Sequence, residues 1–170
     1  MFKWKKFGKI FDPTSNNSNE WMQEYAQLPF PYILNDKVIR VYFATRPKRD
    51  SDLKYTSRSG YVDLDRKNLT QIINISEKPL FEIGSPGSFD EFGAMTSCFV
   101  NVGKKIYGYY TGWSRLLTVP YTMAIGLAIS SDGGDTFKKI SEEPILGQTE
   151  KEPFLLSGPK IIIENGLWHM

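Results

Sequence analysis

A seven-residue segment of this chain recurs after 65 positions. Residues 75–81 read Ile-Ser-Glu-Lys-Pro-Leu-Phe, and residues 140–146 read Ile-Ser-Glu-Glu-Pro-Ile-Leu. An internal period of this length, in a chain rich in short strand patterns, indicates β-units that are stacked or arranged around an axis. The repeat therefore constrains the architecture before any functional motif is considered.

Each period contains the pattern of four strands. Residues 33–43 align with residues 100–110 at an offset of 67, and a third copy begins at Pro159. Each copy reads as an apolar strand, a tight turn with Asn, Asp or Gly, and an alternating or aromatic strand, which is a β-hairpin signal. Two more strand patterns follow, at 59–64 and 123–130. Four strands in roughly 65 residues is the unit of a β-propeller blade, so we predict an all-β propeller of four-stranded antiparallel blades.

About two and a half blades fit into the 170 residues. The boundaries that we predict are a leading outer strand at 2–11, blade one at about 22–81, blade two at about 90–146 and the start of blade three at about 152–170. A five-bladed propeller with this period takes roughly 325 residues. We therefore expect a fragment, or a natural short chain that assembles from several copies, with open propeller edges that favour self-association.

The first strand of this scheme has an alternative interpretation. Residues 4–7 match residues 137–140 at an offset of 133, which places them in the blade pattern. The same basic and aromatic residues also fit an amphipathic membrane segment. The stretch is short for that role and shares the blade pattern, so we predict a strand.

A local motif in residues 130–137 supports the propeller. It fits Ser-x-Asp-x-Gly-x-Thr-aromatic, the Asp-box of several propellers. We expect Asp132 to accept hydrogen bonds from backbone amides, Gly134 to adopt a positive φ, and Phe137 to pack between sheets. We interpret this motif as structural.

Composition excludes several function classes. The 21 basic and 19 acidic residues give a net charge of +2, so nothing calls for nucleic acid or an anionic membrane as a partner. One His and one Cys cannot form a zinc site, and we expect no metal and no cofactor. The lone Cys98 lies in an apolar strand pattern. The sequence has no run of 18 apolar residues, and we expect no signal peptide. A cytoplasmic, reducing setting is favoured.

The repeat also predicts where a site lies. In a propeller, the loops that enter the innermost strands form one rim, and aligning Ser97 with Pro159 sets Asp90 opposite Glu152. The corresponding stretch of blade one, residues 21–29, contains Glu24. Carboxylates that converge from successive blades suit glycosidic bond chemistry, in which one acid protonates the leaving oxygen and a carboxylate activates water or attacks. A carboxylate beside Gly or Pro is also typical of a turn.

Three stretches resemble the five-bladed propeller glycosidases, which include glycoside hydrolase families 43 and 32 and the family 130 mannoside phosphorylases. They are residues 89–93 (Phe-Asp-Glu-Phe-Gly), 106–113 and 125–133, and residues 39–46 are similar to the first inner hairpin of that group. The resemblance implies a first-blade Asp as base or nucleophile, a second-blade Asp that orients substrate, and a third-blade Glu as general acid. By position, Asp90 resembles the second of these and Glu152 the third.

The first-blade Asp of that pattern is absent, and Gln23, Glu24 and Gln27 lie near its place. Glu24 is then the candidate base. Alternatively phosphate attacks, as in the phosphorylases, and Arg46 is a candidate for binding the anion. The other substrate-binding candidates are Trp21, Glu91, Phe92 and Trp113.

Three functions remain open. The first is a glycoside hydrolase, or a phosphorylase, acting on an oligosaccharide or glycoside with a furanose, xylose or mannose-type residue. The second is a non-catalytic sugar-binding propeller, which the missing first-blade Asp favours. The third is an inactive fragment. Sialidase chemistry is a weaker rival, because its arginine cluster and nucleophilic Tyr have no place in the sequence.

Overall fold

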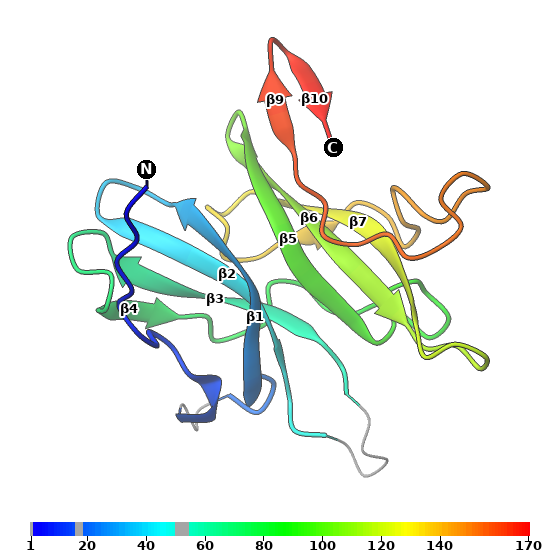
Figure 1. Cartoon of the computed structure of the whole chain (residues 1–170), viewed down its shortest axis with the longest axis horizontal. Coiled ribbons are helices and arrows are strands. Elements are labelled where there is room, and N and C mark those ends of the chain that lie inside the picture. Colours follow the sequence, from blue (N-terminus) through cyan, green and yellow to red (C-terminus); the bar gives the residue numbers. More distant parts are fainter. Residues whose placement is uncertain (1, 16–18, 50–54) are drawn as a thin grey trace.

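The structure, a computed structural model, describes residues 2–15, 19–49 and 55–170 (Figure 1). A short 3-10 helix, η1 (Pro13–Ser15), precedes the first strand. The first sheet contains β1 (Glu24–Ile33), β2 (Val38–Arg46), β3 (Arg58–Asp65) and β4 (Ile72–Ile75). The second contains β5 (Gly93–Val102), β6 (Lys105–Ser114), β7 (Thr122–Ser130) and β8 (Lys138–Lys139). A hairpin of β9 (Ile162–Glu164) and β10 (Leu167–His169) follows.

Both four-stranded sheets have the topology of propeller blades. Their strands follow chain order, β1-β2-β3-β4 and β5-β6-β7-β8, and every neighbouring pair is antiparallel. The first strands of the two sheets, β1 and β5, contact each other. Figure 1 shows the sheets side by side, with the β9–β10 hairpin projecting beyond the second. The predicted all-β, partial propeller fold is confirmed.

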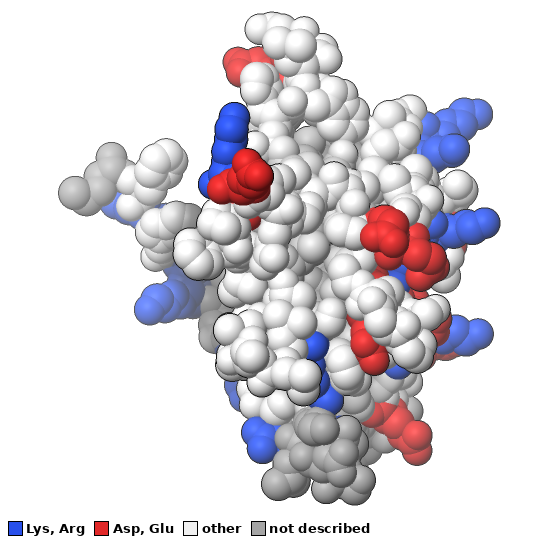
Figure 2. All heavy atoms as spheres, turned by 90° about the vertical axis from the view of Figure 1, so that its right-hand side faces the viewer, with Lys and Arg blue, Asp and Glu red and all other residues white. Residues whose placement is uncertain are grey.

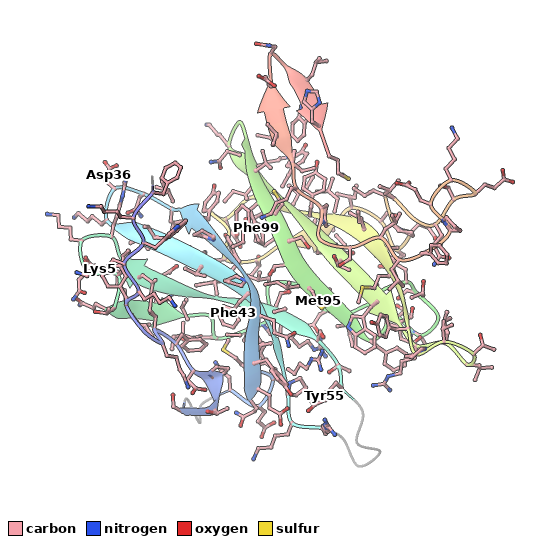
Figure 3. All side chains as sticks on the ribbon, viewed as in Figure 1. Lys5, Asp36, Phe43, Tyr55, Met95 and Phe99 are labelled. Carbon is pink, nitrogen blue, oxygen red and sulfur yellow. The ribbon has the colours of Figure 1, made fainter. Side chains whose placement is uncertain are left out.

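Aromatic side chains fill the space between the two sheets. The rings of Tyr42 and Phe99 stack with centroids 3.8 Å apart, and Phe137 packs edge-on against Phe99 at 5.3 Å. Figure 3 shows Phe99 between the sheets. The buried members of this core are Tyr42, Tyr61, Leu80, Phe81, Ala94, Phe99, Ile106, Tyr110, Ala128 and Phe137. Their burial holds blade one against blade two.

The leading segment does not form the predicted strand. Residues 2–11 have no strand assignment, and Phe2 and Trp4 are almost fully exposed. Ile10 and Phe11 instead pack against a second core of Met22, Phe43, Val62 and Leu64. Among the described residues, no sheet edge pairs with this segment. Its end is held by apolar burial instead.

The turn between β7 and β8 has the hydrogen bonds predicted for residues 130–137. The backbone N–H groups of Asp135 and Thr136 donate to the Asp132 carboxylate at 3.1–3.2 Å. Gly134 has a φ of 93°, and a Cβ there would lie 2.2 Å from the Tyr42 hydroxyl. The turn therefore lies tightly against blade one, where only glycine fits.

A buried arginine joins the same turn to blade one. Arg40 binds both oxygens of Asp63, at 2.7 and 2.9 Å, and donates to Asp135 at 2.7 Å. Its guanidinium lies 3.5 Å from the centre of the Tyr61 ring. Arg40 is thus neutralised by one carboxylate from each blade. Over the described ranges, no helix has the length and apolar character needed to cross a membrane.

Candidate functional site

The two blades are joined by hydrogen bonds at one rim. β2 ends there at Arg46, and β5 begins there at Gly93. The Ser57 N–H donates to the Phe92 carbonyl at 2.9 Å, and the Ala94 N–H donates to the Ser57 carbonyl at 3.3 Å. These bonds fix the ends of strands from both blades, so side chains at this rim have defined positions.

A cavity of about 350 Å³ opens at this rim. Blade one contributes Arg46 and Tyr55, and the other lining residues belong to blade two: Met95, Trp113, Arg115, Tyr121 and Met123. Figure 3 labels Tyr55 and Met95 on the side of the sheets away from the β9–β10 hairpin. The volume lies within the range of small-molecule sites, which is about 300–1,000 Å³.

Aromatic rings hold the two arginines of the cavity. The Arg46 guanidinium lies 4.6 Å from the ring centre of Tyr55 and 5.3 Å from that of Tyr25. The Arg115 guanidinium lies 4.1 Å from the ring centre of Phe92, and it donates a hydrogen bond to the Tyr55 carbonyl. Stacking of this kind positions a guanidinium without neutralising it.

The Trp113 indole is positioned by Gly93, its partner in the β5–β6 register. A Cβ at Gly93 would lie 2.1 Å from Trp113 Nε1, so glycine is needed for the indole to lie there. Trp113 Nε1 and Arg46 Nε are buried and find no hydrogen-bond acceptor within the described part of the chain. A buried donor without an acceptor costs about 1–3 kcal/mol.

Four of the residues predicted for the site lie together at this rim. Arg46 and Trp113 line the cavity, and the Phe92 ring packs on Trp113 with centroids 5.9 Å apart. Glu24 begins β1 directly opposite Arg46 in the β1–β2 register. Hydrogen bonding with Tyr25, and to a lesser extent with Glu24, raises the pKa of Tyr55 above its ordinary value.

Asp90, the predicted second-blade carboxylate, lies between the blades. It is fully buried, and its carboxylate pairs with Lys139 Nζ at 2.5 Å. The Tyr110 hydroxyl and the Ser88 hydroxyl each donate to it at 3.1 Å. Burial, followed by the charge of Asp90, raises the pKa of Tyr110. Asp90 does not line the cavity, and its contacts are those of a structural ion pair.

The other three candidates lie away from the cavity. The Glu91 carboxylate accepts the Gly87 N–H at 3.0 Å within its own loop. The Trp21 indole donates to the Glu77 carbonyl at 3.1 Å and packs against the second core of blade one. Glu152 is exposed, and its backbone N–H and carbonyl bond to Thr149. The repeat alignment paired Glu152 with Asp90, but the two side chains lie in different surroundings.

Sequence reasoning did not select five cavity residues: Tyr55, Met95, Arg115, Tyr121 and Met123. The internal repeat could have identified one of them, Arg115. Arg115 follows Arg46 by 69 positions, close to the repeat offset of 67, so both arginines occupy matching places at the ends of their hairpins.

A second, more apolar cavity of about 460 Å³ lies beside the first and shares Tyr121 with it. It is lined mainly by residues of the 116–122 loop and by Pro153, Phe154 and Leu155. Figure 2 shows the face on the right of Figure 1, where charged side chains occur in small separate groups. Within the described residues, no three His, Cys, Asp or Glu side chains lie close enough to hold a metal ion.

No family model matches this sequence. Two curated relatives are the uncharacterized proteins MT1551 and Rv1502 of Mycobacterium tuberculosis, from strains CDC 1551 / Oshkosh and ATCC 25618 / H37Rv. Each is 34% identical over 167 residues, a match that covers 98% of this chain and 53% of the relative. The chain thus spans about half the length of the curated relatives it matches.

Solved structures share the fold. A glycosyl hydrolase from Bacteroides ovatus matches with a TM-score of 0.59 and 18% identity, over 92% of this chain and 43% of its own. A putative glycosidase from Bacteroides thetaiotaomicron gives a TM-score of 0.55 and 20% identity, over 75% and 35%. A structure from the GH130 family of mannoside phosphorylases, which contains glycoside hydrolases that target β-1,2 mannosidic linkages in Candida mannan, gives 0.53 and 18%, over 92% and 43%. At identities this low, the structural matches show that the chain shares the fold of glycosidase-like proteins.

Proposed function

We propose that this chain binds a saccharide in the rim cavity, as part of a carbohydrate-active protein. The observation that carries the proposal is the composition of the cavity wall. Trp113, Tyr55 and Tyr121 supply aromatic surface, and the two arginines supply hydrogen-bond donors. Sugar rings have apolar C–H faces and polar edges, so aromatic rings next to fixed donors suit them. The glycosidase-like fold supports the same substrate class.

Glycoside cleavage is the second candidate, and Glu24 favours it. Its carboxylate is half-buried at the rim, next to Tyr55 and opposite Arg46. Hydrolysis needs two carboxyl groups about 5–10 Å apart. No described residue lining the cavity is a carboxylate, and Asp90 is held by Lys139. Binding therefore has more support from the geometry than hydrolysis, and phosphorolysis, in which phosphate replaces one carboxylate, stays an alternative.

We further propose that the complete protein is a five-bladed propeller. The sequence pattern of the first sheet recurs in the second after about 65 residues. The match covers only 53% of each curated relative, so these relatives are long enough for further blades.

Binding is tested with Trp113→Ala. We expect the protein to bind mono- and disaccharides in calorimetric titration, and the variant to lose at least about tenfold in affinity, since the stacking aromatic surface is removed. Trp168→Ala is the matched control, because Trp168 is 45% exposed on the β9–β10 hairpin, outside the cavity. Equal affinities in both variants would contradict the rim cavity as the site.

Cleavage is tested with Glu24→Gln. If Glu24 acts as base or nucleophile, the variant binds saccharides normally but loses turnover of aryl glycosides by about 10²–10⁴-fold. The assay is run with and without phosphate, so that phosphorolysis shows as phosphate-dependent turnover. Unchanged turnover in the variant removes Glu24 from the mechanism and leaves the binding proposal standing.

A further inference from the structure

The rim cavity carries positive charge from both blades. Arg46 ends β2 of blade one, and Arg115 directly follows β6 of blade two. Both line the cavity, together with two tyrosines, a tryptophan and two methionines. The described lining therefore contains two cationic groups and no anionic one.

Three other arginines, Arg40, Arg58 and Arg66, pair with carboxylates, whereas Arg49 stacks on Tyr55 at 4.3 Å. Arg40 binds Asp63 and Asp135, each at 2.7 Å, and Arg58 binds Glu82 at 2.9 Å. Arg46 and Arg115 have no carboxylate within 4.0 Å among the described residues. In the part of the chain that the structure describes, their main contacts are aromatic faces, which do not neutralise a guanidinium.

The Arg46 guanidinium points to the same ligand chemistry. Arg46 lines the cavity, and its Nε is buried without an acceptor over the described ranges. A guanidinium binds oxyanions through two parallel N–H donors, and Nε is one of the donors used in that geometry. An oxyanion in the cavity would lie within a lining that contains both Arg46 and Arg115.

One acidic side chain lies near these groups. Glu24 is opposite Arg46 in the β1–β2 register, but no ion pair joins them, and Glu24 does not line the cavity. It weakens the positive potential on one side of Arg46. Arg115, on the other blade, is stacked on Phe92 and bonded to the Tyr55 carbonyl. Counted over the described residues, the charge at the cavity is therefore net positive.

We propose that the saccharide bound in the rim cavity is acidic: its sugar ring carries an oxyanion, a carboxylate or a phosphate, that binds Arg46 and Arg115 while the ring lies against Trp113. This inference rests on the proposed saccharide binding and narrows its substrate class. The charged group is part of the sugar, so free phosphate is a weaker ligand than the charged sugar.

The test is calorimetric titration with matched sugars. The probes are glucose, galactose and mannose, the uronic acids and 6-phosphates of the same three sugars, and inorganic phosphate alone. We expect at least one acidic sugar to bind about tenfold or more tightly than its neutral parent, and its affinity to fall as salt rises. Arg46→Gln and Arg115→Gln remove this preference. Arg66→Gln, an exposed arginine 3.7 Å from Asp36, keeps it.

Each outcome decides between the two proposals. Equal affinity for acidic and neutral sugars overturns the inference and leaves saccharide binding in place. The inference is also overturned if inorganic phosphate binds as tightly as the sugar phosphates, because the anion site then does not recognise the sugar ring. No binding of any sugar, charged or neutral, overturns the proposed function itself.

Discussion

Asp90 is the residue whose surroundings differ most from its expected role. Its side chain is 1% exposed and pairs with Lys139, which is 13% exposed. Removing one partner of a buried ion pair leaves an uncompensated charge and typically costs about 3–5 kcal/mol. We predict that Asp90→Asn lowers the free energy of unfolding by about this amount in urea denaturation.

Two further variants make that measurement specific. Asp90→Asn combined with Lys139→Met removes both charges and should recover much of the loss. Asp36→Asn, at a fully exposed carboxylate 3.7 Å from Arg66, should change stability by less than about 1 kcal/mol. An Asp90→Asn protein with normal stability and no turnover would instead support the catalytic role predicted from the sequence.

Asp132 gives the fold a pH dependence. Burial opposes its ionisation, but hydrogen bonds from Thr136 and Ser130 outweigh that effect and lower its pKa from 3.8 to about 2. A carboxyl whose pKa is lower in the folded state stabilises the fold above the unfolded pKa, and this contribution is lost as pH falls from about 4 through 2.

We therefore predict that Asp132→Asn is less stable than the unmodified protein at pH 7, and that the difference narrows below pH 4. Urea midpoints measured at several pH values between 7 and 2.5 would show it. Asp36→Asn controls for the general effect of removing a surface carboxylate. A stability difference that stays constant over this range would contradict the assigned role of the Asp132 charge.

For single residues, the sequence did not predict the direction in which a loop side chain points. The repeat places Asp90 and Glu152 at matching positions along the chain, but one is fully buried against Lys139 and the other is exposed. Position in a repeat does not say which way a loop side chain points. Arg46 was predicted from its place at the end of a hairpin, and Phe92 and Trp113 as aromatic residues near the carboxylates. The structure brings all three to one rim.

At the scale of elements, the start of β5 controls both the fold and the cavity. Gly93 forms a bridge with Ser57 of blade one, and a Cβ on it would lie 2.7 Å from the Ser57 Cβ and 2.1 Å from Trp113 Nε1. Gly93→Ala must therefore shift the indole or open the junction of the blades. We predict a stability loss of about 1–3 kcal/mol, typical of overpacking, together with at least tenfold weaker saccharide binding.

The control for this substitution is Gly147→Ala. A Cβ at Gly147 meets only Pro144, at an ordinary 3.6 Å, so stability and binding should stay unchanged. Thermal unfolding and calorimetric titration of both variants make the comparison. Normal binding by Gly93→Ala would show that the Trp113 position does not depend on this close approach.

Repeats and turn chemistry predicted the elements well where partners are local. The hairpins β1–β2, β5–β6 and β9–β10 each follow the apolar strand, polar turn and second strand of the repeat. The leading segment is different, because a strand needs an edge to pair with, and no described edge pairs with it. Instead of pairing as a strand, the segment packs Ile10 and Phe11 against the second core.

At the scale of the whole molecule, the β9–β10 hairpin exposes apolar surface. Ile162, Leu167 and Trp168 are 64%, 64% and 45% exposed. Exposed strands with apolar side chains favour pairing with another chain. We predict that the 19.5 kDa chain self-associates at micromolar concentration in light scattering, and that Trp168→Lys shifts it toward monomer. A monomer mass at all concentrations would contradict this.

Saccharide binding at the junction of two blades is tested most directly by the indole N–H signals of the four tryptophans. Trp113 lines the cavity with an unpaired Nε1, whereas Trp21 donates to the Glu77 carbonyl, and Trp4 and Trp168 are exposed elsewhere. During titration with the tightest-binding sugar, followed by ¹H–¹⁵N nuclear magnetic resonance, we predict that the Trp113 signal moves and the other three stay. A titration that shifts another tryptophan and leaves Trp113 unchanged would show that the saccharide binds elsewhere.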